Sequence, residues 1–245
     1  MSGTSAASAV LVLPPATHAP LRALTEALER AEGTNLAAVV VYGSAVRGGY
    51  EPGQSDIDLI VVLNDTDLPH LRAIAEPLLL ARFQARVEAM VLKRDNIAPA
   101  ADVFPLLYDD VRQRHVLLSG SDPFGGLEIQ DTHRRLRIEQ ELREARIRLR
   151  RAVVDAFGSE ANLAGPVARK VKQLRGPLHA LLLLKGKAPD DRLEAVLEAT
   201  GAVYGIDTSP LLRVASAPEA AHTALRKVLD AAIGDVDGLD LGASR

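Results

Sequence analysis

The spacing of apolar residues changes near residue 130. Before that point, short apolar runs alternate with helical patterns, whereas from residue 131 onward the spacing is helical throughout. Runs typical of buried strands cover residues 36–41, 56–63 and 86–92, and helical spacing covers residues 18–32 and 68–83. The pattern predicts an α/β (α+β) fold with a small mixed sheet flanked by helices, followed by a C-terminal helical bundle.

The same pattern divides the chain into four segments. We expect residues 1–14 to be disordered, residues 15–129 to form the sheet-containing domain, residues 130–235 to form the helical domain, and residues 236–245 to fray. Residues 108–120 fit either a helix or a strand with a turn.

Breaker and capping residues set the expected helix limits. Pro77 is expected to start or kink the second half of its helix, and Gly176-Pro177 to kink or break the second bundle helix. Asp190-Asp191 are predicted to cap a third bundle helix that runs to Thr200, and Pro218 to open a fourth.

A Gly-Ser turn and two aspartates make up the most informative stretch. Gly43-Ser44 follows the first strand, and Asp56 and Asp58 open the second. Because strand side chains alternate, both aspartates should share a face. Mg²⁺ usually takes one or two protein carboxylates, and phosphoryl-transfer sites hold metal ions roughly 3.5–4 Å apart. The turn would cradle phosphates with backbone N–H groups and the Ser44 hydroxyl, while Arg47 would add positive charge.

This arrangement resembles the polymerase-β-like nucleotidyltransferase superfamily, in which a Gly-Ser turn precedes Asp-x-Asp at a strand start by about ten residues. Here eleven residues separate Gly43-Ser44 from Asp56-Ile57-Asp58. The stretch is most similar to the aminoglycoside (streptomycin/spectinomycin-type) adenylyltransferase branch. The resemblance is specific over residues 36–64 and weaker to about residue 129. It implies a catalytic domain over 15–129, ATP as the donor substrate and a small-molecule acceptor.

The resemblance also implies a third carboxylate on the neighbouring strand, and Glu88 is the match. Glu88 would complete the metal site with Asp56 and Asp58 or act as general base. The alternative is an exposed strand glutamate. Among other acidic residues, Asp95 fits a helix start, Asp65 and Asp67 fit a turn and cap, and Asp109 and Asp110 fit caps or surface positions better than substrate contacts.

Composition excludes several classes of site. The chain has no cysteine, and its six histidines show no ligand spacing, so neither a disulfide nor a zinc site is expected. No apolar run reaches the roughly 18 residues of a membrane span, and the N-terminus lacks a basic signal region, which predicts a cytoplasmic protein. Acidic ends and 3% aromatic residues disfavour a nucleic-acid partner.

Charge is unevenly distributed. Residues 130–189 carry a net charge of +8, whereas residues 1–129 carry −6 and residues 190–245 carry −5. One interpretation is that the basic segment faces the active site and attracts the triphosphate. The other is that its arginines pair with Glu139, Glu141 and Glu144 and with solvent.

Together these observations predict a Mg²⁺-dependent enzyme that transfers a nucleoside monophosphate, AMP from ATP, to a hydroxyl of a small molecule. Two alternatives stay open. One is a nucleotidyltransferase of the antitoxin type that modifies a protein, and the other is a non-catalytic nucleotide-binding regulatory module. The first is disfavoured by the helical bundle, and the second by the set of three carboxylates.

Overall fold

The computed structural model describes residues 13–239. These residues form two compact units, one made of residues 13–101 and 107–128, the other of residues 102–106 and 129–239. Most of the predicted disordered N-terminus and frayed tail lies outside the described residues. Leu13 is buried, and the last helix continues to Gly238, so these two ends of the described chain are ordered further than expected.

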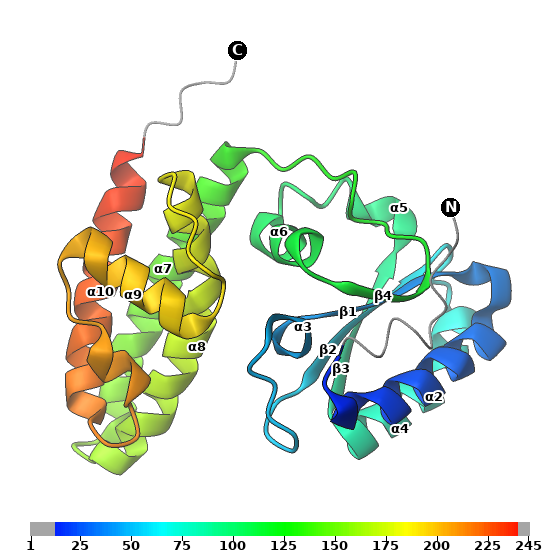
Figure 1. Cartoon of the computed structure of the whole chain (residues 1–245), viewed down its shortest axis with the longest axis horizontal. Coiled ribbons are helices and arrows are strands. Elements are labelled where there is room, and N and C mark those ends of the chain that lie inside the picture. The colour runs from blue at the N-terminus through cyan, green and yellow to red at the C-terminus, as the bar shows by residue number, and fades with distance from the viewer. Residues whose placement is uncertain (1–12, 240–245) are drawn as a thin grey trace. The chain divides into compact units, whose positions relative to one another are not determined.

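A four-stranded mixed sheet organises the first unit (Figure 1). Its strands are β1 (Leu36–Tyr42), β2 (Ile57–Leu63), β3 (Val87–Lys93) and β4 (Val116–Gly120). The order is β3-β2-β1-β4, with β1 antiparallel to both neighbours and β2 parallel to β3. The predicted small mixed sheet is confirmed.

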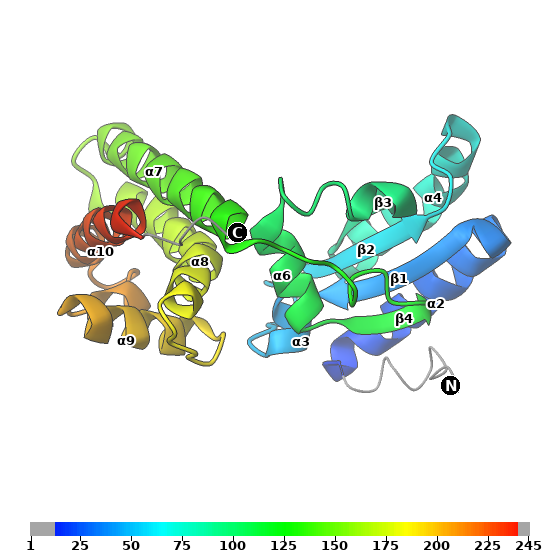
Figure 2. The same ribbon diagram turned by 90° about the horizontal axis from the view of Figure 1, so that it is seen from above.

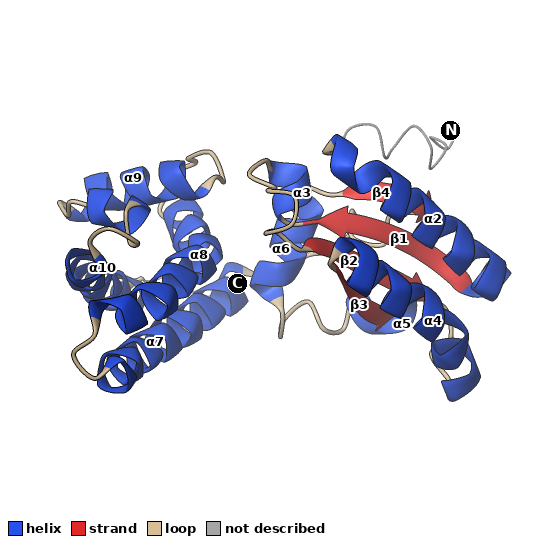
Figure 3. Ribbon diagram, turned by 90° about the horizontal axis from the view of Figure 1, so that it is seen from below, coloured by secondary structure: helices blue, strands red, loops and turns tan. Residues whose placement is uncertain are grey.

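Two long helices, α2 (Pro15–Glu32) and α4 (Leu68–Ala85), lie side by side across one face of this sheet (Figure 3). Leu21 and Leu24 of α2 and Ile74 of α4 pack against alternate strand residues such as Val41 and Leu59. Pro77 lies inside α4, which continues unbroken, so of the two outcomes predicted there, a new start or a kink, the new start is wrong.

The remaining elements of this part of the chain are short. They are η1 (Gly33–Asn35), α3 (Ser44–Arg47), α5 (Arg94–Ile97) and α6 (Pro105–Gln113). The ambiguous stretch 108–120 therefore contains both alternatives, because α6 ends at Gln113 and β4 begins at Val116. Figure 2 shows α6 on the side of the sheet away from α2 and α4.

The second unit is a helical bundle, as predicted. It contains α7 (Asp131–Ala156), α8 (Glu160–Leu184), α9 (Leu193–Tyr204), η2 (Ser209–Leu212) and α10 (Pro218–Gly238) around one apolar core. Pro218 opens α10 as expected. The predicted cap of α9 is wrong, because Arg192 is the N-cap residue and Asp190 accepts the Arg192 backbone N–H instead. Across residues 13–239, no helix is long and apolar enough to cross a membrane.

Helix α8 runs without a break through two Gly-Pro steps, Gly165-Pro166 and Gly176-Pro177. Of the two outcomes predicted for the second step, a kink or a break, the break is therefore wrong. Proline crowds the residue before it, and a glycine at that place has no Cβ to collide with the ring. Burial of Pro177, Leu174 and Leu178 then outweighs the loss of a backbone hydrogen bond.

Candidate active site

The Gly-Ser turn joins β1 to the one-turn helix α3. Gly43 has a φ of 75°, in the left-handed region that favours glycine, and its carbonyl accepts the N–H groups of Val46 and Arg47. A Cβ at position 43 would overlap Oδ2 of Asp58. The turn and the second aspartate of Asp-x-Asp therefore lie in direct contact, although fourteen residues separate them in sequence.

Strand register brings Asp58 and Glu88 together. Asp58 on β2 is the partner of Glu88 on β3 and of Tyr42 on β1, so the three side chains share a face. Residues that flank them, such as Ile57 and Val87, point to the core under α2 and α4. Glu88 thus lies on the face of the sheet that a metal-site role demands. Asp56 lies one residue before β2 rather than in it.

Burial and neighbouring charges shift the pKa of the Asp58 carboxyl. Burial raises the pKa of Asp58 to about 6, from an ordinary value of 3.8. Arg47 opposes this rise, while the negative charges of Asp56, Asp110 and Glu88 add to it. Four carboxylates therefore act on one another here, and a single arginine offsets part of their repulsion at Asp58.

Two of these carboxylates, Asp56 and Glu88, pair with arginines at the end of α4. Arg86 Nη2 lies 2.7 Å from Asp56 Oδ1, and Arg82 Nε lies 3.2 Å from Glu88 Oε1, with roughly half of each side chain exposed. Both arginines come from the C-terminal end of α4, where Arg86 takes the left-handed conformation (φ 54°). Within residues 13–239, no three acidic or histidine side chains are gathered closely enough to hold a metal ion.

The site fits Mg²⁺ by its donors and its charge. Carboxylate oxygens are the ligands that Mg²⁺ prefers, and Asp58 and Glu88 present them from adjacent strands. Burial and, after it, the neighbouring carboxylates raise the pKa of Asp58 by disfavouring its charged form, and a bound cation would favour that form. Gathering Asp56 and Glu88 around one ion requires their exposed pairs with Arg86 and Arg82 to open, which costs little.

Arg47 and Asp110 form an ion pair that the sequence did not reveal. Arg47 Nη1 lies 2.5 Å from Asp110 Oδ2, and both side chains are largely buried. Burial raises the pKa of Tyr42 to about 12, with further contributions from Asp58 and Asp110, so its hydroxyl stays protonated. Arg47 thus lies near the carboxylates, and a phosphate bound there would compete with Asp110 for its guanidinium group.

The other acidic candidates lie elsewhere. Asp65 and Asp67 follow the far end of β2, and Asp95 lies in α5. The expectation that Asp109 and Asp110 cap a helix or lie on the surface is wrong, because both are inside α6, where Asp109 is buried and pairs with Arg112. No local sequence signal distinguishes Asp110; only the fold brings it beside Arg47.

Known proteins resemble this chain at the level of family and fold. A family model described as a nucleotidyltransferase domain matches residues 21–147, just over half of the chain, and that range includes all of the predicted site residues. Among curated proteins, none matches. A solved structure, spectinomycin adenyltransferase AAD(9) from Enterococcus faecialis with ATP and spectinomycin, is 13% identical, with a TM-score of 0.52 over 89% of this chain and 98% of that one. At this identity the likeness concerns the fold. The chain belongs to the nucleotidyltransferase family, and it is a nucleotidyltransferase enzyme.

Proposed function

We propose that this enzyme transfers AMP from ATP to a hydroxyl group of a small molecule, with Mg²⁺ as its metal and the cytoplasm as its location. One observation carries the proposal. The backbone of Gly43 lies against the carboxylate of Asp58. A triphosphate held at the Gly43-Ser44 turn would therefore have its oxygens beside the carboxylates that are proposed to hold Mg²⁺.

The predicted residues other than Arg47 have defined tasks in this scheme. Backbone N–H groups at the start of α3 and the Ser44 hydroxyl would bind the β- and γ-phosphates. Because α3 has a single turn, these individual donors matter more than any helix dipole. Asp56 and Asp58, with Glu88, would hold Mg²⁺, which when bound neutralises charge that develops on the phosphates.

The reaction would be an in-line displacement. The acceptor hydroxyl attacks the α-phosphorus, a new phosphorus–oxygen bond forms, and the bond to the β-phosphate breaks as pyrophosphate leaves. Glu88 would accept the hydroxyl proton, provided that its exposed pair with Arg82 has opened. Asp58 would remain ionised, as a metal ligand must.

The acceptor is proposed to be a small molecule because the similar solved structure holds spectinomycin together with ATP. The experiment incubates the full chain with ATP labelled at the α-phosphate, Mg²⁺ and a panel of hydroxyl compounds that includes spectinomycin, and in parallel with cell lysate. We expect that a small molecule becomes labelled, that this labelling requires Mg²⁺, and that EDTA prevents it. Label on a protein band alone would overturn the small-molecule acceptor and favour the protein-modifying alternative.

Matched aspartate variants test the site itself. Asp58→Asn should abolish transfer, whereas Asp67→Asn, the same change past the opposite end of β2, should leave it unchanged. If Asp58→Asn transferred label at the normal rate, the carboxylates would not be the metal site. Binding of ATP without any transfer to any acceptor would favour the regulatory alternative.

A further inference from the structure

A pocket of about 340 Å³ lies between α7 and α10, inside the helical unit. Leu149 of α7 is buried beneath it, and Val153 adds apolar surface one turn further on. The polar part of the lining comes from both helices and is dominated by arginine. This volume is in the range of small-ligand pockets.

Positive charge in the pocket exceeds negative charge. Arg146 and Arg226 share one carboxylate, that of Asp230, at 3.5 and 3.3 Å. Arg150 also lines the pocket, and within residues 13–239 its side chain makes no hydrogen bond or ion pair. Three guanidinium groups and a single carboxylate thus line the pocket, which gives it a net positive charge.

His222 completes the lining and stays neutral. Its pKa is lowered by burial and then by Arg226 on the same helix, with Glu219 opposing; Arg146 and Arg150 are the charged groups that α7 contributes to the same pocket. A neutral imidazole offers one donor and one acceptor beside the arginines.

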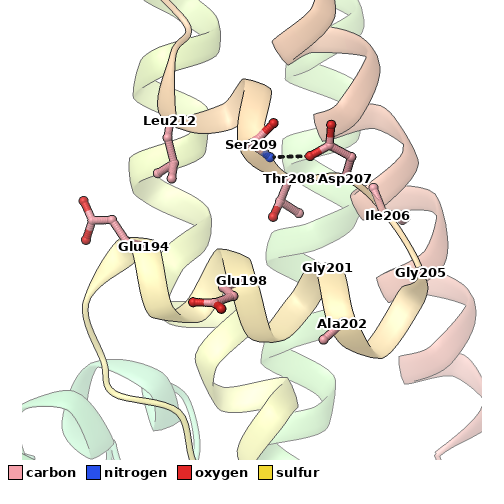
Figure 4. A pocket seen from close by; sticks show the side chains of 10 residues that line it. All are labelled: Glu194, Glu198, Gly201, Ala202, Gly205, Ile206, Asp207, Thr208, Ser209 and Leu212. Atoms are coloured by element: carbon pink, nitrogen blue, oxygen red, sulfur yellow. Dashed lines mark hydrogen bonds between the residues drawn. The ribbon is translucent and has the colours of Figure 1, made fainter.

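A second pocket in the same unit has the opposite character. It lies on α9 and η2, measures about 530 Å³ and is lined by the carboxylates of Glu194, Glu198 and Asp207 (Figure 4). Asp207 already accepts the backbone N–H of Ser209. Of these two pockets, the one between α7 and α10 therefore combines positive charge with an apolar floor.

We propose that the α7–α10 pocket binds a small organic anion: a carboxylate or phosphate ester joined to an apolar ring or chain. The anionic group would lie against Arg150 and Arg226, since planar guanidinium groups bind carboxylate and phosphate oxygens in pairs. The apolar part would cover Leu149 and Val153. All of the lining residues belong to the helical unit, and none of them is assigned to catalysis.

Phenyl phosphate is a suitable probe, with benzyl alcohol as its neutral analogue and inorganic phosphate as the analogue without a ring. Ring signals of His222 in the NMR spectrum of the full chain, assigned with the variant His222→Gln, report binding at this pocket and not at the ATP site. We expect phenyl phosphate to shift these signals in a saturable way, inorganic phosphate to do so more weakly, and benzyl alcohol to leave them unchanged.

Three variants locate the contacts. Arg150→Gln should weaken phenyl phosphate binding by about tenfold, the value of a hydrogen bond to a charged group. Arg151→Gln is the matched control, because Arg151 pairs with Asp155 and does not line the pocket, and it should bind normally. Asp230→Asn should tighten binding, since it releases Arg146 and Arg226 for the ligand.

Several results would overturn the proposal. They are unshifted His222 signals at millimolar phenyl phosphate, an equal loss of affinity in Arg150→Gln and Arg151→Gln, and an equal response to benzyl alcohol. Inorganic phosphate binding as tightly as phenyl phosphate would also overturn it, because the apolar floor would then contribute nothing.

Discussion

Glycine 43 and aspartate 58 occupy adjoining space, and this gives the glycine a task beyond leaving room for phosphate. Its φ of 75° suits glycine, and its missing Cβ makes room for a carboxylate of the same site. A side chain at position 43 would therefore displace Asp58 even before nucleotide enters.

The variants Gly43→Ala and Gly53→Ala separate the effect of backbone strain from the effect of overlap with Asp58. Gly53 has a φ of 78°, but a Cβ there would meet nothing within 4 Å. Both variants should lose roughly 1–2 kcal/mol of unfolding free energy to backbone strain. Only Gly43→Ala should lose more than this and also lose transfer activity, as measured by denaturant unfolding and α-labelled ATP. Equal losses in the two variants would show that the contact with Asp58 is unimportant.

Asp58→Asn should stabilise the fold while it removes activity. Because the folded-state pKa of Asp58 is raised to about 6, the wild type keeps its full stability below pH 3.8 and loses some as pH rises through 6. At pH 7 without Mg²⁺ the variant should therefore be more stable, by on the order of 1–2 kcal/mol after allowance for solvent screening. Unfolding curves between pH 3.5 and about 7.5 measure this difference. Asp67→Asn, the same substitution outside the carboxylate cluster, is the control.

Local sequence pattern placed Gly43 in a turn, Asp58 at the start of the second strand and Glu88 within the third. The position of Glu88 beside Asp58 was implied by the family resemblance, and the strand register agrees with it. It could not find the arginine partners of Asp56 and Glu88, or Asp110 beside Arg47. Those pairs depend on where a helix end or a distant helix lies after folding, which residue spacing along one strand does not encode.

Among whole elements, those with long and regular apolar spacing were predictable within a few residues, as α2, β1 and α10 show. The stretch that contains α6 and β4 could not be predicted in this way. Each element is too short for the spacing of its apolar residues to distinguish a helix from a strand. The α9 cap failed for another reason, since either Asp190, Asp191 or Arg192 can precede a helix and local loop geometry decides.

Three bundle helices meet at Asp235. Its carboxylate accepts the Tyr204 hydroxyl from the end of α9 at 2.6 Å and the Lys185 ammonium from the end of α8 at 2.8 Å, while Asp235 itself lies on α10. Burial and the Asp235 carboxylate raise the pKa of Tyr204 above its ordinary value of 10.0. The protonated Tyr204 hydroxyl therefore donates one of the hydrogen bonds that connect these helices.

Tyr204→Phe should lower the unfolding free energy by about 1–2 kcal/mol, since a hydrogen bond to a charged group is lost. The contribution of Tyr204 to the unfolding free energy is fully present below pH 10, the ordinary tyrosine pKa. Above that pH it declines, because the Tyr204 hydroxyl ionises in the unfolded chain while the raised pKa keeps it protonated in the folded one. Wild type and variant should therefore converge in strongly alkaline solution. Denaturant unfolding at about pH 8 and about pH 11, on either side of the ordinary tyrosine pKa, measures the difference between wild type and variant. Tyr50→Phe is the control, because within the described chain the Tyr50 hydroxyl makes no hydrogen bond; it should cost little.

On the scale of the whole molecule, the basic segment 130–189 divides into arginines with partners and at least one without. Arg137, Arg143 and Arg148 pair with glutamates on α7 itself, and Arg143 also reaches Asp237 on α10. Exposed pairs of this kind contribute little to stability and reduce the charge left to attract a triphosphate.

A charge-reversal scan of the remaining arginines and lysines of α7 and α8 tests whether any face the ATP site. Reversal of such a residue should raise KM for ATP steeply at low salt and less at high salt, because salt screens the attraction. Arg213→Glu, which changes net charge equally outside this segment, is the control. If every reversal left KM as in the control, the segment would have no part in nucleotide attraction.

The two Gly-Pro steps of α8 have a consequence for its opening motions. Each proline lacks the N–H that would reach the carbonyl four residues earlier, at Asn162 and at Gln173, so the hydrogen-bond ladder of α8 has two gaps. The prolines are eleven residues apart, three helical turns, which puts both gaps on one face. Helix α7 is of similar length and contains no proline. Amide protons next to the gaps should therefore exchange with solvent faster than those of α7, and α8 should open in segments while the bundle around it stays closed.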